Sequence, residues 1–199
     1  MLLAIDSATA ACSIALIEGE RLIDERHEVV GRGHAERLVP MIEEMLGGRR
    51  PHDILVDCGP GSFTGVRVGL AAAHGLAIGW GIPVAGYSSL ALIAAAVGDG
   101  EIAVALEGGH GQLFVQSYGH DPLGARTELR SLAPAEAAAV TPEHRVYGSG
   151  ARALVTARGF GEAQNALPRA ADARLLPLRL RDLPPRPIYG RAPDAKPMQ

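Results

Sequence analysis

The sequence is organised around the stretch Gly59-Pro60-Gly61-Ser62-Phe63-Thr64-Gly65-Val66-Arg67-Val68-Gly69. It follows a short apolar run at residues 53–57, and its four glycines and one proline indicate a tightly turning backbone. Glycine reaches positive φ and lets other atoms approach closely, whereas Pro60 fixes its own φ and keeps Gly59 out of the helical region. The stretch therefore predicts a strand, a tight loop and then a helix that begins near Thr64.

Glycine-rich loops between a strand and a helix often bind phosphate, but the spacing here matches none of the common motifs. A P-loop needs glycine five residues before Gly-Lys-Ser/Thr, and Pro60 stands at that place before Gly65. A dinucleotide fingerprint from Gly59 and Gly61 needs glycine or alanine where Thr64 stands. A serine nucleophile at Ser62 needs glycine two residues to either side, and Pro60 and Thr64 occupy those places. We therefore interpret this as a structural glycine loop, carried by Gly59, Pro60, Gly61, Ser62, Thr64, Gly65 and Gly69.

The helix behind the loop carries a ridge of small residues at four-residue spacing, Gly65, Gly69, Ala73 and Ala77. Such a ridge lies on one helix face and admits another backbone. Because glycine inside a helix costs about 0.5–1 kcal/mol relative to alanine, its repetition indicates close packing. We expect this helix to form half of a subunit interface.

Composition is typical of a soluble globular protein of 199 residues, with 47% hydrophobic and 21% charged residues and a net charge of −3. This charge argues against a dominant nucleic-acid surface. Two cysteines, Cys12 and Cys58, and no apparent signal peptide favour the cytoplasm. Residues 68–98 contain no Asp, Glu, Lys or Arg, but glycines and a proline interrupt them, so we expect no membrane span.

Hydrophobic periodicity predicts alternating strands and helices. Expected strands cover residues 2–5, 12–17, 21–30, 53–57, 82–86, 102–106, 113–118, 127–132 and 145–147. Expected helices cover residues 34–46, 64–78, 88–97 and 134–140, with Pro40 delaying the regular part of the first and Ser88 capping the third. Residues 160–181 give no clear pattern, and an extended tail is expected from Pro184.

Few residues outside the glycine stretch are candidates for metal binding or catalysis. No two of the seven histidines are placed at i, i+4 on one helix, so we expect no metal site, and His34 has Leu38 at the ligand spacing. Asp6, at the end of the first strand, is either catalytic or a turn cap, and Glu107 is equally open. No nucleophile, base and orienting group come together, so no catalytic residue is assigned and no cofactor is expected.

Four blocks in order resemble the TsaB family, also called YeaZ. They are Ala4-Ile5-Asp6-Ser7-Ala8-Thr9 with Cys12-Ser13-Ile14-Ala15-Leu16, His34-Ala35-Glu36-Arg37-Leu38-Val39-Pro40-Met41-Ile42, the glycine stretch itself, and Pro187-Ile188-Tyr189-Gly190-Arg191. The stretch is close to Gly-Pro-Gly-Ser-Phe-Thr-Gly-x-Arg-x-Gly, the most specific of the family's motifs. The match is strong over residues 2–97 and patchy beyond. Two departures are Glu107-Gly108-Gly109, where the family usually has an Asp-Ala-Arg-like sequence, and Asp57-Cys58.

The resemblance implies an α/β fold of the actin, Hsp70 and sugar-kinase (ASKHA) class, with two subdomains of mixed sheet and flanking helices. We assign residues 1–99 to the N-terminal subdomain, 100–183 to a reduced C-terminal subdomain and 184–199 to a proline-rich tail. Asp6 and Ser7 would mark a vestigial phosphate loop. The implied function is that of a non-catalytic scaffold that supports formation of threonylcarbamoyladenosine in tRNA, next to the anticodon.

The implied partners are a catalytic paralogue, TsaD, joined through a four-helix bundle, and an ATPase subunit, TsaE, with tRNA contacted through the complex. A homodimer is expected when the partner is absent. The expected interface residues are Leu38, Met41, Ile42, Met45, Arg67, Leu70, His74 and Ile78. An actin-fold ATPase or kinase acting alone through Asp6 and the glycine loop is the alternative, and a protease activity is a remoter one. A basic segment with Arg179, Arg181 and Arg186 is a weaker candidate for direct tRNA contact.

Overall fold

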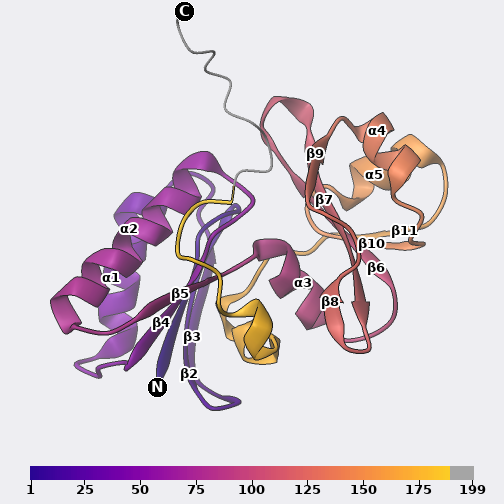
Figure 1. Ribbon diagram of the computed structural model, residues 1–199. Coiled ribbons are helices and arrows are strands. Elements are labelled where there is room, and N and C mark those ends of the chain that lie inside the picture. The colour runs from indigo at the N-terminus through magenta and orange to yellow at the C-terminus, as the bar shows by residue number, and fades with distance from the viewer. Residues whose placement is uncertain (189–199) are drawn as a thin grey trace, which may run out of the picture.

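The computed structural model describes residues 1–188, which form two lobes, each built on one mixed sheet (Figure 1). The first sheet has the strand order β3-β2-β1-β4-β5. Its strands are β1 (Leu2–Asp6), β2 (Ala11–Glu18), β3 (Arg21–Val29), β4 (Asp53–Asp57) and β5 (Val84–Tyr87). β1 pairs antiparallel with β2 and parallel with β4, and β4 pairs parallel with β5. The apolar runs of β1 and β4 are consistent with strands that are covered on both faces.

The second sheet repeats this plan, with the strand order β11-β10-β6-β7-β8 and β9 paired to β7. Its strands are β6 (Ile102–Glu107), β7 (Leu113–His120), β8 (Leu123–Ala125), β9 (Arg130–Leu132), β10 (Arg145–Tyr147) and β11 (Glu162–Gln164). β6 pairs antiparallel with β7 and parallel with β10, as β1 does with β2 and β4. The duplicated topology confirms the expected ASKHA fold class with two subdomains.

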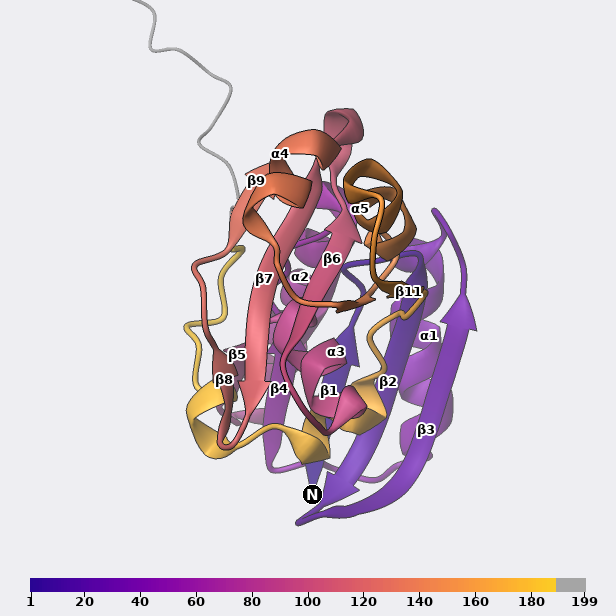
Figure 2. The same cartoon turned by 90° about the vertical axis from the view of Figure 1, so that its right-hand side faces the viewer.

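Helices separate and cover the two sheets, so that five layers follow one another (Figures 1 and 2). α1 (His34–Leu46) and α2 (Phe63–Trp80) cover the outer face of the first sheet, and α4 (Pro134–Val140) and α5 (Ala151–Arg158) cover that of the second. Between the sheets lies α3 (Ser89–Val97), which is buried almost entirely and joins both lobes in one hydrophobic core. The site described below borders the start of this central helix, where the Ser89 amide donates to the Gly59 carbonyl at 3.1 Å.

Most of the expected elements are present, with small differences at the helix ends. α1 begins at His34 and contains Pro40, so the proline does not delay the helix. α2 begins one residue earlier than expected, and Ser62 caps it by accepting a 3.2 Å hydrogen bond from the Gly65 amide. Ser88 precedes α3, but its side chain makes no capping hydrogen bond.

The segment after the second sheet returns to the first lobe. The short 3₁₀ helices Ala170–Leu175 and Leu178–Leu180 follow β11, and the first of them contacts α3, β1, β2 and β3. Leu183 then bridges Gly86 at the edge of β5. The expected boundary at 183 therefore groups with the second subdomain a segment whose first part, Ala170–Leu175, packs on the first sheet. Tyr189 to Gln199, the larger part of the expected tail, lie outside the described residues.

A search of residues 1–188 for a helix that could cross a membrane finds none of sufficient length and hydropathy.

Candidate functional site

The loop and first turns of α2 pack directly on the turn that follows β1. A Cβ atom on Gly61 would overlap the carbonyl group of Ala8, and one on Gly65 would overlap the carbonyl oxygen of Ser7. The Ser62 amide donates to the Ala8 oxygen at 2.6 Å, and the Ser7 hydroxyl donates to the Gly65 oxygen at 2.9 Å. These contacts explain why the helix begins with glycines.

The partner of the small-residue ridge differs from the one expected. The ridge meets this chain's own backbone at Ser7, where Gly65 lies, and Gly69 packs on the Ser7 hydroxyl. Only later in α2, at Gly75 and Gly79, would a Cβ atom point into open space. The glycines at the start of α2 therefore serve packing within the subunit.

Two aspartates lie beneath this junction, one from each of two neighbouring parallel strands. Asp6 ends β1, Asp57 ends β4, and both side chains are buried. Asp6 Oδ2 accepts a 3.0 Å hydrogen bond from the Tyr87 hydroxyl, and Asp57 Oδ1 accepts 2.8 Å hydrogen bonds from the Gly59 amide and the Ser89 hydroxyl. Burial raises the pKa of Asp57 to about 7, and burial together with the Asp57 charge raises the pKa of Asp6.

A cleft of about 610 Å³ opens between the lobes above these groups. Its first-lobe wall is formed by the turn after β1 and the start of α2, and its second-lobe wall by the β6–β7 turn. Its polar or charged lining residues are Thr9, Ser62, Arg67, Glu107, His110, Gln112, Ser131 and Ser149. Asp6 does not line this cleft, because its buried carboxyl group points to Tyr87 and Asp57.

The second-lobe wall contains an unusual backbone conformation. His110 has φ of 60°, a value that residues other than glycine rarely adopt. It stands between Gly109 and Gly111 in the turn where the sequence departs from the family pattern, and the Glu107 amide donates to the Ser149 hydroxyl at 3.1 Å. The departure from the family pattern therefore falls on the wall of the cleft.

The apolar stripe of α1 is buried in this chain's own core. Leu38, Met41, Ile42 and Met45 are each at most 2% exposed, and Leu70 of α2 is 5% exposed. They pack on the outer face of the first sheet. The expectation that these five side chains meet a partner is therefore corrected: they anchor the two helices to the sheet.

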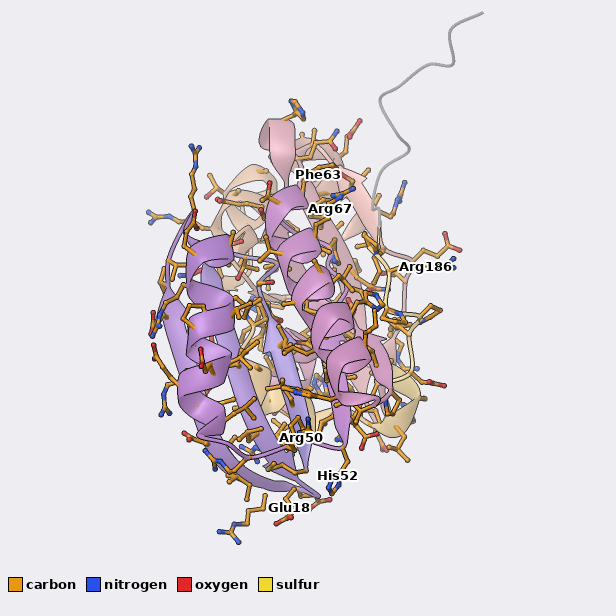
Figure 3. All side chains as sticks on the ribbon, turned by 90° about the vertical axis from the view of Figure 1, so that its left-hand side faces the viewer. Glu18, Arg50, His52, Phe63, Arg67 and Arg186 are labelled. Carbon is orange, nitrogen blue, oxygen red and sulfur yellow. The ribbon has the colours of Figure 1, made fainter. Side chains whose placement is uncertain are left out.

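The other three expected interface residues lie at the surface of α2. Ile78 is 84% exposed, His74 is exposed with Nε2 3.0 Å from the Pro185 carbonyl oxygen, and Arg67 is half-buried. The Arg67 guanidinium lies over the Phe63 ring and donates to the Phe63 oxygen at 2.9 Å. Figure 3 shows α1 and α2 side by side on one face of the molecule, with Phe63 and Arg67 at the first turns of α2.

Comparison with known proteins places this architecture in one family. Residues 26–141 match the sequence model of the family described as "TsaD: tRNA N6-adenosine threonylcarbamoyltransferase". The chain is 36% identical over 132 residues to the tRNA threonylcarbamoyladenosine biosynthesis protein TsaB of Escherichia coli (strain K12), covering 62% of this chain and 57% of that protein. Its fold matches the crystal structure of a Pseudomonas aeruginosa protein with similarity to peptidase YEAZ, with a TM-score of 0.81 and 28% identity over 96% of this chain and 99% of that one. The chain belongs to the TsaB (YeaZ) family.

The share of a relative's length that this chain covers differs from one relative to another. The chain spans little more than half the length of the E. coli protein. It is also 31% identical to the uncharacterized protein Rv3421c of Mycobacterium tuberculosis (strain ATCC 25618 / H37Rv), with 98% of this chain and 94% of that protein covered. A second Pseudomonas aeruginosa structure, YeaZ, matches with a TM-score of 0.77 and 27% identity over 94% of this chain and 98% of that one.

Two further expectations for this TsaB-family chain concern metal binding and the basic segment. Within residues 1–188 no group of three or more His, Cys, Asp or Glu side chains could hold a metal ion. In the basic segment, Arg179 donates to the Leu123 carbonyl, and Arg181 donates to the carbonyls of Leu176 and Arg174 at 2.6 Å each. Two of the three arginines considered for tRNA contact are therefore engaged with this chain's own backbone.

Sequence reasoning missed Asp57 and Tyr87 as neighbours of Asp6, and Ser89 as a donor to Asp57. A signal was present, because Asp6 and Asp57 each follow three buried apolar residues of a short strand. Parallel strands bring their carboxyl ends to the same edge of a sheet, and this arrangement places two such aspartates together. Phe63, His110 and Ser149 were also not identified as cleft residues, because the wall that they form joins three distant segments.

Proposed function

We propose that this chain is the non-catalytic docking subunit of the machinery that forms threonylcarbamoyladenosine in tRNA, working in the cytoplasm. Membership of the TsaB family supports the pathway, since the E. coli relative is named for it. In this proposal the chain pairs with the catalytic paralogue TsaD through helices, the ATPase subunit TsaE joins them, and tRNA is contacted through the assembly.

The observation that carries the proposal is the surface of α2. We define the α2 face as its exposed residues Phe63, Thr64, Ala71, His74, Gly75, Ile78 and Gly79. The face includes an isoleucine that is 84% exposed, two glycines that admit close approach, and no acidic residue. Exposed apolar surface of this kind favours a protein partner.

Neighbouring α1 completes a surface of two parallel helix faces (Figure 3). Val39, halfway along α1, is 50% exposed, whereas Glu36, Glu43 and Glu44 give the rest of its surface an acidic character. The buried stripe beneath holds both helices on the sheet, so the surface is formed before a partner arrives. Two such helix pairs can pack as a four-helix bundle.

The alternative function, an ATPase or kinase acting through Asp6, needs that carboxyl group at the ligand. Asp6 is instead buried against Tyr87 and Asp57, and the carbonyl of Ala8 in the turn above it is already bound by the Ser62 amide. A ligand in the cleft would therefore not meet Asp6 in this arrangement. The geometry favours the docking subunit.

Reconstitution tests the proposal. The catalytic paralogue and the ATPase subunit of the same organism are incubated with threonine, bicarbonate, ATP, the enzyme that makes threonylcarbamoyl-adenylate, and a tRNA transcript, with and without this chain. We expect threonylcarbamoyladenosine, measured by mass spectrometry of digested tRNA, to form only when the chain is present. Equal formation without it, or ATP turnover by this chain alone that is lost in Asp6→Asn, would contradict the proposal.

A further inference from the structure

The buried aspartates at the ends of β1 and β4 have an unusual set of partners. Asp6 is 0% exposed and Asp57 is 2% exposed, and the neighbouring strand residues Ile5 and Val56 are paired in register. One oxygen of each carboxyl group accepts the hydrogen bonds from Tyr87, Gly59 and Ser89 that are described above. The other two oxygens, Asp6 Oδ1 and Asp57 Oδ2, have no hydrogen-bond partner among the described residues.

The two carboxyl groups are also neighbours of one another, since each directly follows one of the paired residues Ile5 and Val56 and the Asp57 charge raises the pKa of Asp6. An ionised carboxylate only accepts hydrogen bonds, so two facing carboxylates would leave both oxygens unpaired and would repel. A protonated carboxyl group supplies the missing donor. One proton between the groups therefore satisfies both orphan oxygens.

We propose that Asp6 remains a neutral acid at neutral pH, that its Oδ1–H donates to Oδ2 of an ionised Asp57, and that this shared proton ties the end of β1 to the end of β4, where the glycine loop begins. Asp57 is the better carboxylate of the two, because the Gly59 amide and the Ser89 hydroxyl both donate to it. Ser89 also contacts the Pro60 carbonyl at 3.1 Å, so Asp57 and Ser89 together hold the beginning of the glycine loop.

The surroundings agree with a single charge on the pair. Burial is the largest cause that raises the pKa of each aspartate. The other titratable groups that face them are Tyr87 of β5, Cys12 of β2 and Cys58 after β4. Burial raises the pKa of the Tyr87 hydroxyl, and it raises the pKa of each thiol to about 11, so all three are neutral at neutral pH.

An acid whose pKa is higher in the folded protein than in the unfolded chain makes the stability of the protein fall as pH rises. The folded protein keeps a proton that the unfolded chain has lost, so the contribution to stability is full at low pH and is lost as pH rises toward the folded pKa. The unfolding constant of the wild type should therefore grow with pH, relative to a variant without this proton. The expected slope is about tenfold per pH unit above about pH 5.

Asp6→Asn is the informative variant, because its amide can donate to Asp57 while its carbonyl oxygen accepts from Tyr87. Unfolding constants of the wild type and Asp6→Asn are measured by chemical denaturation from pH 5 to pH 8. We expect their ratio to change by about tenfold per pH unit over much of this range. Asp53→Asn is the control, since Asp53 is exposed at the start of β4, the strand that Asp57 ends, and its profile should follow that of the wild type. Parallel profiles of wild type and Asp6→Asn would overturn the proposal.

A second measurement does not depend on any variant being well folded. Infrared spectroscopy of the wild type at pH 7.5 should show the carbonyl band of a protonated carboxylic acid. That band should persist in Asp53→Asn and disappear in Asp6→Asn. A wild-type spectrum without the band at pH 7.5 would show that both aspartates are ionised, and the shared proton would be excluded.

Discussion

The Ser7 hydroxyl donates a 2.9 Å hydrogen bond to the carbonyl oxygen of Gly65, across 58 residues of sequence. A Cβ atom on Gly65 would overlap the Ser7 carbonyl oxygen, so the helix can lie on the turn only because residue 65 is glycine. The same relationship between Gly61 and Ala8 fixes the loop that precedes the helix. The glycine stretch thus acts as the joint between β1 and α2.

Gly65→Ala should destabilise the protein by about 1–3 kcal/mol or more, because the added methyl group meets backbone rather than a movable side chain. Gly75→Ala is the matched control in the same helix, where nothing lies within 4 Å of the added atom. It should stabilise by up to about 1 kcal/mol, the difference in helix propensity. Urea denaturation of both variants measures this, and equal effects would contradict the packing described for Ser7.

Met41→Ala should cost about 2–5 kcal/mol, because the side chain is fully buried between α1 and the first sheet. Val39→Ala, two residues earlier and 50% exposed, should change the free energy of unfolding by less than about 0.5 kcal/mol. Comparing Met41→Ala with Val39→Ala distinguishes a stripe that anchors α1 to the sheet from one that is exposed for a partner. A small effect of Met41→Ala on the isolated chain would mean that the stripe is not packed as described.

Tyr87→Phe should destabilise by about 1–3 kcal/mol, because it leaves a buried oxygen of Asp6 without its donor. Since the Tyr87 hydrogen bond lowers the pKa of Asp6, its loss should raise that pKa further. The loss of stability with rising pH should then extend to higher pH than in the wild type. Denaturation profiles at pH 5 to pH 9 test this, and a profile parallel to that of the wild type would argue against the contact.

Sequence patterns predicted the order of strands and helices well where each element buries a periodic apolar face, as in α1 and β4. They also predicted that a backbone approaches the small-residue ridge of α2, as the Ser7 backbone does at Gly65. They could not say which backbone, because the contact with Ser7 depends on how β1 and α2 are placed in space. The same limit explains why the α1 residues were wrongly expected at an interface. Periodicity identifies the apolar stripe of α1, but it cannot distinguish a stripe buried by the chain's own sheet from one buried by a partner.

The buried aspartates and the cleft show a second limit. An aspartate at a strand end is usually a solvated cap, and only the pairing of β1 with β4 brings Asp6 and Asp57 together. The return of residues 170–183 to the first lobe likewise follows from packing on α3 and β2, and short 3₁₀ helices have little periodicity.

The most direct test of the docking proposal measures the affinity of this chain for the catalytic paralogue by isothermal titration calorimetry. Ile78→Glu changes the α2 face, and Leu178→Glu is the matched control, since Leu178 is 82% exposed on another surface and Ile78 is 84% exposed. We expect both variants to fold, Leu178→Glu to bind like the wild type, and Ile78→Glu to bind about 30-fold more weakly or not at all. Wild-type affinity in Ile78→Glu would contradict the account.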